Sequence, residues 1–125
     1  FDMVACISTL EHIAHFESAV DNMARLLKPG GHLVLTCPYT ENTYVDNVYK
    51  RPGSGANPEV TYICQSFSRA NLEKWLSRNR LKIAEQEYWQ CFDGDVWSVG
   101  KAINPPRKVS KDEKHQLTCL LLQKI

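Results

Sequence analysis

The stretch FDMVACISTLEHIAHFESAVDNMARLLKPGGHLVLTCP, residues 1–38, decides the fold of this chain. Residues 1–7 form a short, almost continuously apolar run, which is typical of a strand buried on both faces. The next apolar residues recur at helical spacing and are Phe16, Ala19, Val20, Met23, Leu26 and Leu27. Residues 29–31, Pro-Gly-Gly, end that helix, and residues 32–37 form a second apolar strand. A strand, a helix of about four turns and another strand predict a right-handed parallel βαβ unit.

The segment that follows this unit carries no sustained period. Residues 39–66 contain the Gly- and Pro-rich run 51–58, and residues 44–49 are compatible with a short helix. A loop of this length inside a compact domain is typically a lid or a binding loop. Ser68 is a fair N-cap for a helix that runs to about Asn79.

The last third of the chain predicts two further strands, over residues 81–89 and 117–122. Residues 92–100 are interpreted as turn and loop, and the polar, proline-containing residues 102–115 as a solvated connection. The whole chain is therefore expected to form one domain with three parts, residues 1–38, 39–66 and 67–125.

Composition excludes several classes of function. The chain has 125 residues and a formal net charge of +1, so nothing indicates a nucleic acid or an anionic membrane as partner. No apolar run approaches the roughly 20 residues that cross a bilayer, and we expect no membrane association. The five cysteines include no CxxC pair, so we interpret them as buried and reduced, and expect a cytoplasmic protein.

The spacing of two histidines is only a weak indication of a metal site. His12 and His15 are three residues apart, but no carboxylate pattern accompanies them, and we expect no bound metal.

With its Phe-Asp strand, its Ser8-Thr9-Leu10-Glu11-His12 turn and the later Leu27-Lys28-Pro29-Gly30-Gly31 stop, the chain resembles the class I S-adenosylmethionine-dependent methyltransferases. The resemblance implies an α/β, three-layer Rossmann-like fold, of which this chain holds the fourth to seventh strands. The last strand is expected to insert antiparallel between the fifth and the sixth. The family's first half, with its Gly-rich loop and an acidic residue that binds the ribose, is not in this sequence, so the fold is expected to be partial.

The same resemblance implies which residues meet the cofactor, S-adenosylmethionine. Ser8, Thr9, Leu10, Glu11 and His12 follow the strand whose carboxyl end faces the cofactor. His12 is the candidate catalytic base, although the family often uses this residue only for positioning. Glu11 is expected to orient His12 or, by preference, to cap the next helix.

The methyl acceptor is expected over the strand ends, beneath the loops that follow the fifth and sixth strands. The aromatic candidates to line it are Tyr39, Tyr44, Tyr49, Trp89 and Trp97, with ordinary loop packing as the equal alternative.

The leading hypothesis is methyl transfer to a small molecule, such as a sugar or polysaccharide precursor, by the carboxyl-terminal half of an enzyme that is inactive when this half is isolated. The alternative is a non-catalytic assembly module, in which the exposed first strand pairs with a second copy to form a homodimer. A different nucleotide-binding enzyme is less favoured, because Gly53-Ser54-Gly55 follows no strand and opens no helix.

Overall fold

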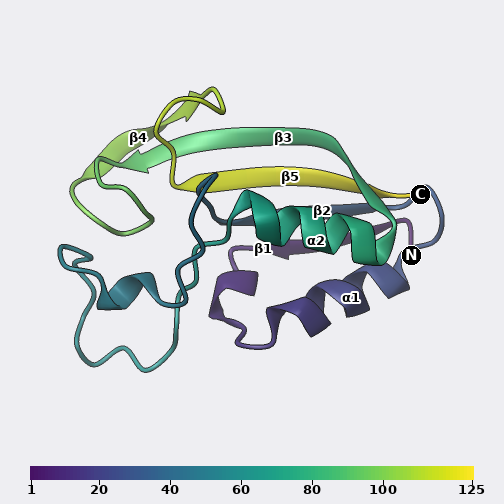
Figure 1. Ribbon diagram of the computed structural model, residues 1–125, viewed down its shortest axis with the longest axis horizontal. Coiled ribbons are helices and arrows are strands. Elements are labelled where there is room, and N and C mark those ends of the chain that lie inside the picture. Colours follow the sequence, from purple (N-terminus) through teal and green to yellow (C-terminus); the bar gives the residue numbers. More distant parts are fainter.

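The computed structural model describes all 125 residues and shows one five-stranded mixed sheet with two α-helices (Figure 1). The α-helices are α1 (Phe16–Leu26) and α2 (Arg69–Asn79). The strands are β1 (Met3–Ile7), β2 (His32–Pro38), β3 (Leu81–Phe92), β4 (Ala102–Val109) and β5 (Leu117–Lys124). Two short 3-10 helices, η1 (Leu10–His12) and η2 (Val48–Lys50), lie in the connections.

The sheet order is β1-β2-β5-β3-β4, which confirms the predicted topology of the four main strands. β1 and β2 are parallel, with Met3 opposite His32, and α1 connects them. β5 lies between β2 and β3 and is antiparallel to both, with Leu35 opposite Leu120. The last strand of the chain is thus inserted in the middle of the sheet, as expected from the resemblance.

Two glycines shape the turn between α1 and β2. Gly30 has a φ of +83°, a conformation that L side chains rarely adopt. At Gly31 a Cβ would lie 3.0 Å from each of three backbone carbonyl oxygens, those of Phe1, Asp2 and Lys28. The second glycine therefore lets the turn pack directly against the backbone at the start of the chain.

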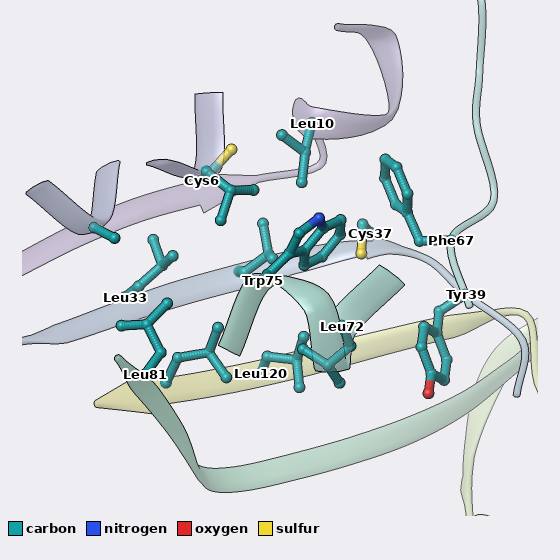
Figure 2. Packing of buried hydrophobic residues seen from close by; sticks show 14 of the residues in the cluster. Cys6, Leu10, Leu33, Cys37, Tyr39, Phe67, Leu72, Trp75, Leu81 and Leu120 are labelled. Atoms are coloured by element: carbon teal, nitrogen blue, oxygen red, sulfur yellow. The ribbon is translucent and has the colours of Figure 1, made fainter. Parts of the chain in front are cut away.

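Both α-helices lie on the same face of the sheet, and the core fills the space between them and the strands (Figures 1 and 2). Leu33, Leu35 and Cys37 of β2 point into this core and are completely buried, whereas the alternating Val34 and Thr36 are only half-buried. The chain therefore supplies the sheet and one helical layer of the three-layer fold, and no helix of the chain covers the opposite face.

The structure corrects the interpretation of residues 102–115 as a connection. β4 (Ala102–Val109) pairs antiparallel with β3, which itself runs to Phe92 rather than to Trp89. Pro105 and Pro106 argued against a strand, but β4 is the outermost strand, and an edge strand tolerates residues that cannot donate to a neighbour.

The two ends of the long segment between β2 and α2 are paired with each other. Tyr39 and Phe67 form a parallel bridge, and Val45 and Ser66 form an antiparallel one. A small second apolar cluster beneath the segment contains Val45, Val48, Cys64 and Val96. The short helix expected over residues 44–49 is reduced to the single turn η2.

All five cysteines are free thiols. None of the helices has the length and apolar character needed to cross a membrane.

Candidate functional site

A sharp turn follows β1, at the edge of the sheet where the parallel strands β1 and β2 have their carboxyl ends. Ser8 has a φ of +48°, and its amide donates to both the carbonyl and the hydroxyl oxygen of Thr36, at 3.1 and 3.0 Å. The Thr9 hydroxyl donates to the carbonyl of Ile7 at 2.9 Å. These bonds lock the turn to β2 and leave the side chains of Ser8 and Thr9 exposed.

The two residues after this turn are buried. Leu10 is fully enclosed in the main core (Figure 2), and Glu11 is only 3% exposed. The Oε2 atom of Glu11 has no hydrogen-bond partner, and burial raises the pKa of this carboxyl. A buried acceptor without a donor is uncommon, because it loses water and gains nothing in return. The residue at the N-cap of α1 is His15, four positions after Glu11 along the chain.

His12 joins the turn to the long segment 39–66. Its Nδ1 lies 2.7 Å from the carbonyl oxygen of Ile63, and its ring packs edge-on against Tyr62 at 5.0 Å. Because a carbonyl can only accept, Nδ1 carries the proton and, in the neutral ring, Nε2 is an acceptor. The exposed imidazole thus presents a proton-accepting nitrogen at the carboxyl edge of the sheet.

Gln65 makes the same connection from the interior. Its backbone amide donates to the carbonyl of Glu11 at 2.8 Å, and its side-chain amide donates to the carbonyl of Ile13 at 2.8 Å. Its side-chain oxygen accepts from the Tyr44 hydroxyl at 2.5 Å. The turn and the long segment therefore form one hydrogen-bonded unit, in which Tyr44 also packs against Phe16 and Phe67.

The structure separates the aromatic candidates. Tyr44 and Tyr49 lie in the segment that contacts the turn, where the Tyr49 ring packs against Tyr62 at 5.9 Å. Tyr39 is 1% exposed and its hydroxyl donates to Glu41. Trp89 sits in β3 opposite Leu117, on the sheet face that carries no helix.

Trp97, the fifth aromatic candidate, packs on Phe92 next to the smaller cluster. Trp89 borders an apolar cavity of about 360 Å³ that also includes Pro105, Pro106 and Leu117. Trp89 therefore lies on a different face from the tyrosines, whereas Trp97 packs against the same small cluster as Tyr49.

Sequence reasoning missed a polar cluster around Arg69. The Arg69 guanidinium, at the start of α2, donates to both oxygens of Glu41, to the Tyr88 hydroxyl and to Gln86. The Arg69 guanidinium also lies 5.6 Å from the centre of the Tyr39 ring. A cation in the first turn of a helix opposes the helix dipole, and that was the one signal of a special role.

Near this cluster, residues 40–42 and 111–115 and Asp95 enclose a cavity of about 230 Å³. It lies among the loops that follow β2, β3 and β4, whereas the acceptor was expected beneath the loops that follow β2 and β3. His115, which borders this cavity, carried no sequence signal because its neighbours come from distant parts of the chain. In the structure no group of three or more His, Cys, Asp or Glu residues is arranged to hold a metal ion.

Comparison with known proteins identifies the family to which the fold belongs. Residues 1–86 match a family described as a methyltransferase domain. The ubiquinone biosynthesis O-methyltransferase of Alkalilimnicola ehrlichii is 50% identical over 36 residues, which are 29% of this chain and 15% of that protein.

Solved structures show the same fold over the full length of this chain. A protein from Thermotoga maritima, described as an S-adenosylmethionine-dependent methyltransferase and possible histamine N-methyltransferase, gives a TM-score of 0.60 at 18% identity and is covered over 56% of its length. An S-adenosylmethionine-dependent methyltransferase from Methanosarcina mazei gives 0.57 at 19% identity and is covered over 59%. The chain thus spans little more than half the length of these structures.

The strand order and the likeness to these structures define a Rossmann-like α/β fold. Because the family match covers more than half of the sequence, the chain belongs to the methyltransferase domain family. Membership of this family implies S-adenosylmethionine as the cofactor.

The turn fits one side of such a cofactor. S-Adenosylmethionine carries ammonium and hydroxyl donors, and the turn offers the exposed hydroxyls of Ser8 and Thr9 and the unpartnered carboxylate oxygen of Glu11. The Gly-rich run 51–58 lies in the long segment and follows no strand, so it provides no phosphate- or cofactor-binding loop.

Proposed function

We propose that this chain supplies one wall of an S-adenosylmethionine site and the adjoining acceptor wall, and that the complete protein methylates a small molecule. The observation that carries the proposal is the hydrogen-bonded unit of the turn 8–12 with residues 63–65. This unit supports the proposal because it ties the turn 8–12 firmly to residues 63–65, and methyl transfer depends chiefly on the positioning of its two reactants.

In this proposal the residues of the turn have separate roles. Ser8, Thr9 and Leu10 form the rim against which the cofactor lies, and the cofactor supplies an electrophilic methyl group. Nε2 of His12 takes the proton that a hydroxyl or amine acceptor loses. Tyr44 and Tyr49, in the segment held by His12, contribute to the acceptor wall, and a sugar-like precursor suits their mixed apolar and hydrogen-bonding character.

The first test is binding of the cofactor to the 125-residue chain. Calorimetric titration with S-adenosylmethionine is expected to give a dissociation constant weaker than about 1 mM, because the turn is only one wall of the site. Micromolar binding to a confirmed monomer would overturn the claim that this chain holds only one wall of the cofactor site.

A second test reads the DNA upstream of the codon for Phe1. We expect an open frame that encodes a strand followed by Gly-x-Gly-x-Gly. The encoded longer protein is expected to transfer the labelled methyl group of S-adenosylmethionine to a small hydroxyl- or amine-bearing acceptor.

The free thiols agree with a reducing compartment, for which we propose the cytoplasm.

One observation favours a second candidate function, a dimerisation module. β1 pairs only with β2, so its outer edge has no neighbouring strand, and Met3 and Ile7 are 60% and 53% exposed. A second copy that pairs along this edge would extend the sheet and cover both side chains.

A further inference from the structure

The polar cavity near the Arg69 cluster lies where three separate parts of the chain meet. Residues 40–42 follow β2, Asp95 lies in the loop after β3, and residues 111–115 lead into β5. Because β5 is antiparallel to β2, with Leu117 opposite Pro38, its first residues lie at the carboxyl edge of β2. None of the lining residues is hydrophobic, so a ligand here would be held by hydrogen bonds and charge.

His115 borders this cavity and is 6% exposed. One face of its imidazole stacks on Tyr39, with ring centres 6.0 Å apart and an interplanar angle of 12°. Tyr88 packs against the ring at 4.9 Å. The hydroxyls of Tyr39 and Tyr88 are hydrogen-bonded to Glu41 and Arg69, respectively. The two rings that contact the imidazole are therefore fixed in position.

The hydrogen bonds of this ring define its tautomer. Nδ1 lies 2.8 Å from the carbonyl oxygen of Glu113, which can only accept, so Nδ1 carries the proton. Nε2 of the neutral ring is then an acceptor, and it has no hydrogen-bond partner. A buried acceptor that has given up water without gaining a donor favours a ligand that brings an N–H or O–H group.

The charges around the cavity favour a cation among such ligands. Glu41 is neutralised by Arg69, and Asp95 pairs with Lys114 at 3.7 Å. This leaves the carboxylates of Asp112 and Glu113 against the ammonium of Lys111, and Oε1 of Glu113 also accepts from the backbone amide of Ser110 at 3.1 Å. Residues 111–114 are all exposed, so the cavity meets solvent along this side.

We propose that this cavity binds a small ammonium-bearing molecule, with Nε2 of His115 accepting a hydrogen bond from its N–H group and Asp112 and Glu113 balancing its charge. The inference rests on the proposed function, because it narrows the methyl acceptor to one that carries an amine. In this proposal Nε2 of His115 binds the amine, and the rings of Tyr39 and Tyr88 hold the imidazole in place.

Two probes of equal size test this assignment on the ¹⁵N-labelled chain. Propane-1,3-diamine and propane-1,3-diol are titrated separately while the imidazole ¹⁵N resonances are followed, with His15 and His32 as internal controls. The diamine is expected to shift the Nε2 resonance of His115 and to leave those of His15 and His32 unchanged, and the diol to leave the His115 resonance unchanged at the same concentration. An equal effect of the two probes, a uniform shift of His15, His32 and His115, or no shift of His115 would overturn the proposal.

Matched variants locate the contact. His115→Phe keeps an aromatic ring for the stack but removes Nε2, and is expected to weaken diamine binding by about tenfold. Asp112→Asn removes one exposed carboxylate and is expected to weaken binding severalfold, whereas His32→Phe and Glu59→Gln bind as the unaltered chain does. If His115→Phe does not fold, the proposal is tested by the Nε2 resonance of the unaltered chain and by diamine binding to Asp112→Asn. Unchanged diamine binding by Asp112→Asn contradicts the proposal.

This outcome is separable from that of the methyl-transfer assay. Methylation of a hydroxyl acceptor with no effect of the diamine would overturn the inference and leave the proposed function standing. Diamine binding at His115 by a protein that transfers no methyl group would overturn the proposed function and leave the binding of an amine at His115 standing.

Discussion

Arg69 and Glu41 form a two-bond ion pair, with Nη2 to Oε1 at 2.9 Å and Nε to Oε2 at 3.0 Å. The pair joins the start of α2 to the loop after β2, and both side chains are mostly buried, at 23% and 18% exposure. Lysine cannot reproduce the planar two-bond contact, so Arg69→Lys and Glu41→Gln are each expected to lower the free energy of unfolding by about 1–3 kcal/mol.

A double-mutant cycle in urea measures the coupling of this pair. The control is the exposed pair of Arg78 and Glu17, for which Arg78→Lys and Glu17→Gln are expected to change stability by less than about 1 kcal/mol. Equal coupling energies for the two pairs would contradict the structural role of Arg69.

The same pair predicts a loss of stability in acid. Burial by itself raises the pKa of the Glu41 carboxyl, but the hydrogen bonds and charge of Arg69 outweigh burial and lower it. A carboxyl with a lowered folded-state pKa stabilises the fold above the unfolded value of about 4.3, and this contribution is lost as pH falls through the folded value. Denaturation midpoints measured from pH 7 to pH 3 should fall more steeply for the unaltered chain than for Glu41→Gln.

For Glu11 the expected pH dependence of stability is opposite to that for Glu41. Burial raises the pKa of its carboxyl, so the folded state resists ionisation and this residue's contribution to stability declines as pH rises above about 4.3. Glu11→Gln cannot ionise, so between pH 4.5 and pH 7.5 the unaltered chain is expected to lose more unfolding free energy than this variant does. The exposed Glu59→Gln serves as control, and an identical pH dependence for all three chains would show that Glu11 is not strained by burial.

Two variants of His12 separate positioning from catalysis. The amide nitrogen of His12→Asn can replace Nδ1 in the bond to Ile63, whereas that of His12→Gln lies nearer the position of Nε2. Amide hydrogen exchange of residues 63–65 is therefore expected to quicken in His12→Gln and to stay slow in His12→Asn. If Nε2 acts as the base, both variants of the complete enzyme lose methyl transfer by about a hundredfold or more. Full activity in His12→Asn would leave His12 a positioning role only.

The turn after α1 predicts unequal effects of two alanine substitutions. Gly31→Ala places a Cβ 3.0 Å from three carbonyl oxygens and is expected to destabilise the fold by about 1–3 kcal/mol. Gly30→Ala meets no atom within 4 Å and is opposed only by its positive φ, at about 1 kcal/mol. Urea unfolding of the two variants gives the comparison, and a larger loss in Gly30→Ala would contradict the close packing at Gly31.

The open edge of β1 predicts self-association. Sedimentation of the 125-residue chain is expected to show dimers or larger species, and Ile7→Lys should shift the population toward monomer because a charge blocks edge pairing. Leu26→Lys, at a residue of α1 that is 51% exposed, is the control and should leave the distribution unchanged. A stable monomer of the unaltered chain would argue against the dimerisation module.

The fold was predictable where neighbours in sequence are also neighbours in space. The apolar strand, the helix from Phe16 and the Pro-Gly-Gly stop carry their own local signals, so residues 1–38 were assigned correctly from the sequence. β4 was missed because its stability comes from pairing with β3, while its own prolines favour a loop. The resemblance gave the insertion of β5, which no local pattern in residues 117–122 could have indicated.

The candidate site divides in the same way. The sequence by itself determined the family and the turn from Ser8 to His12, because that motif is contiguous and its strand, turn and helix propensities agree with one another. Only the tertiary structure brought His12 to Ile63, Arg69 to Glu41, and His115 to Tyr39. These partners are 51, 28 and 76 residues apart, and their contacts arise from chain reversal and burial, which leave no periodic trace in the sequence.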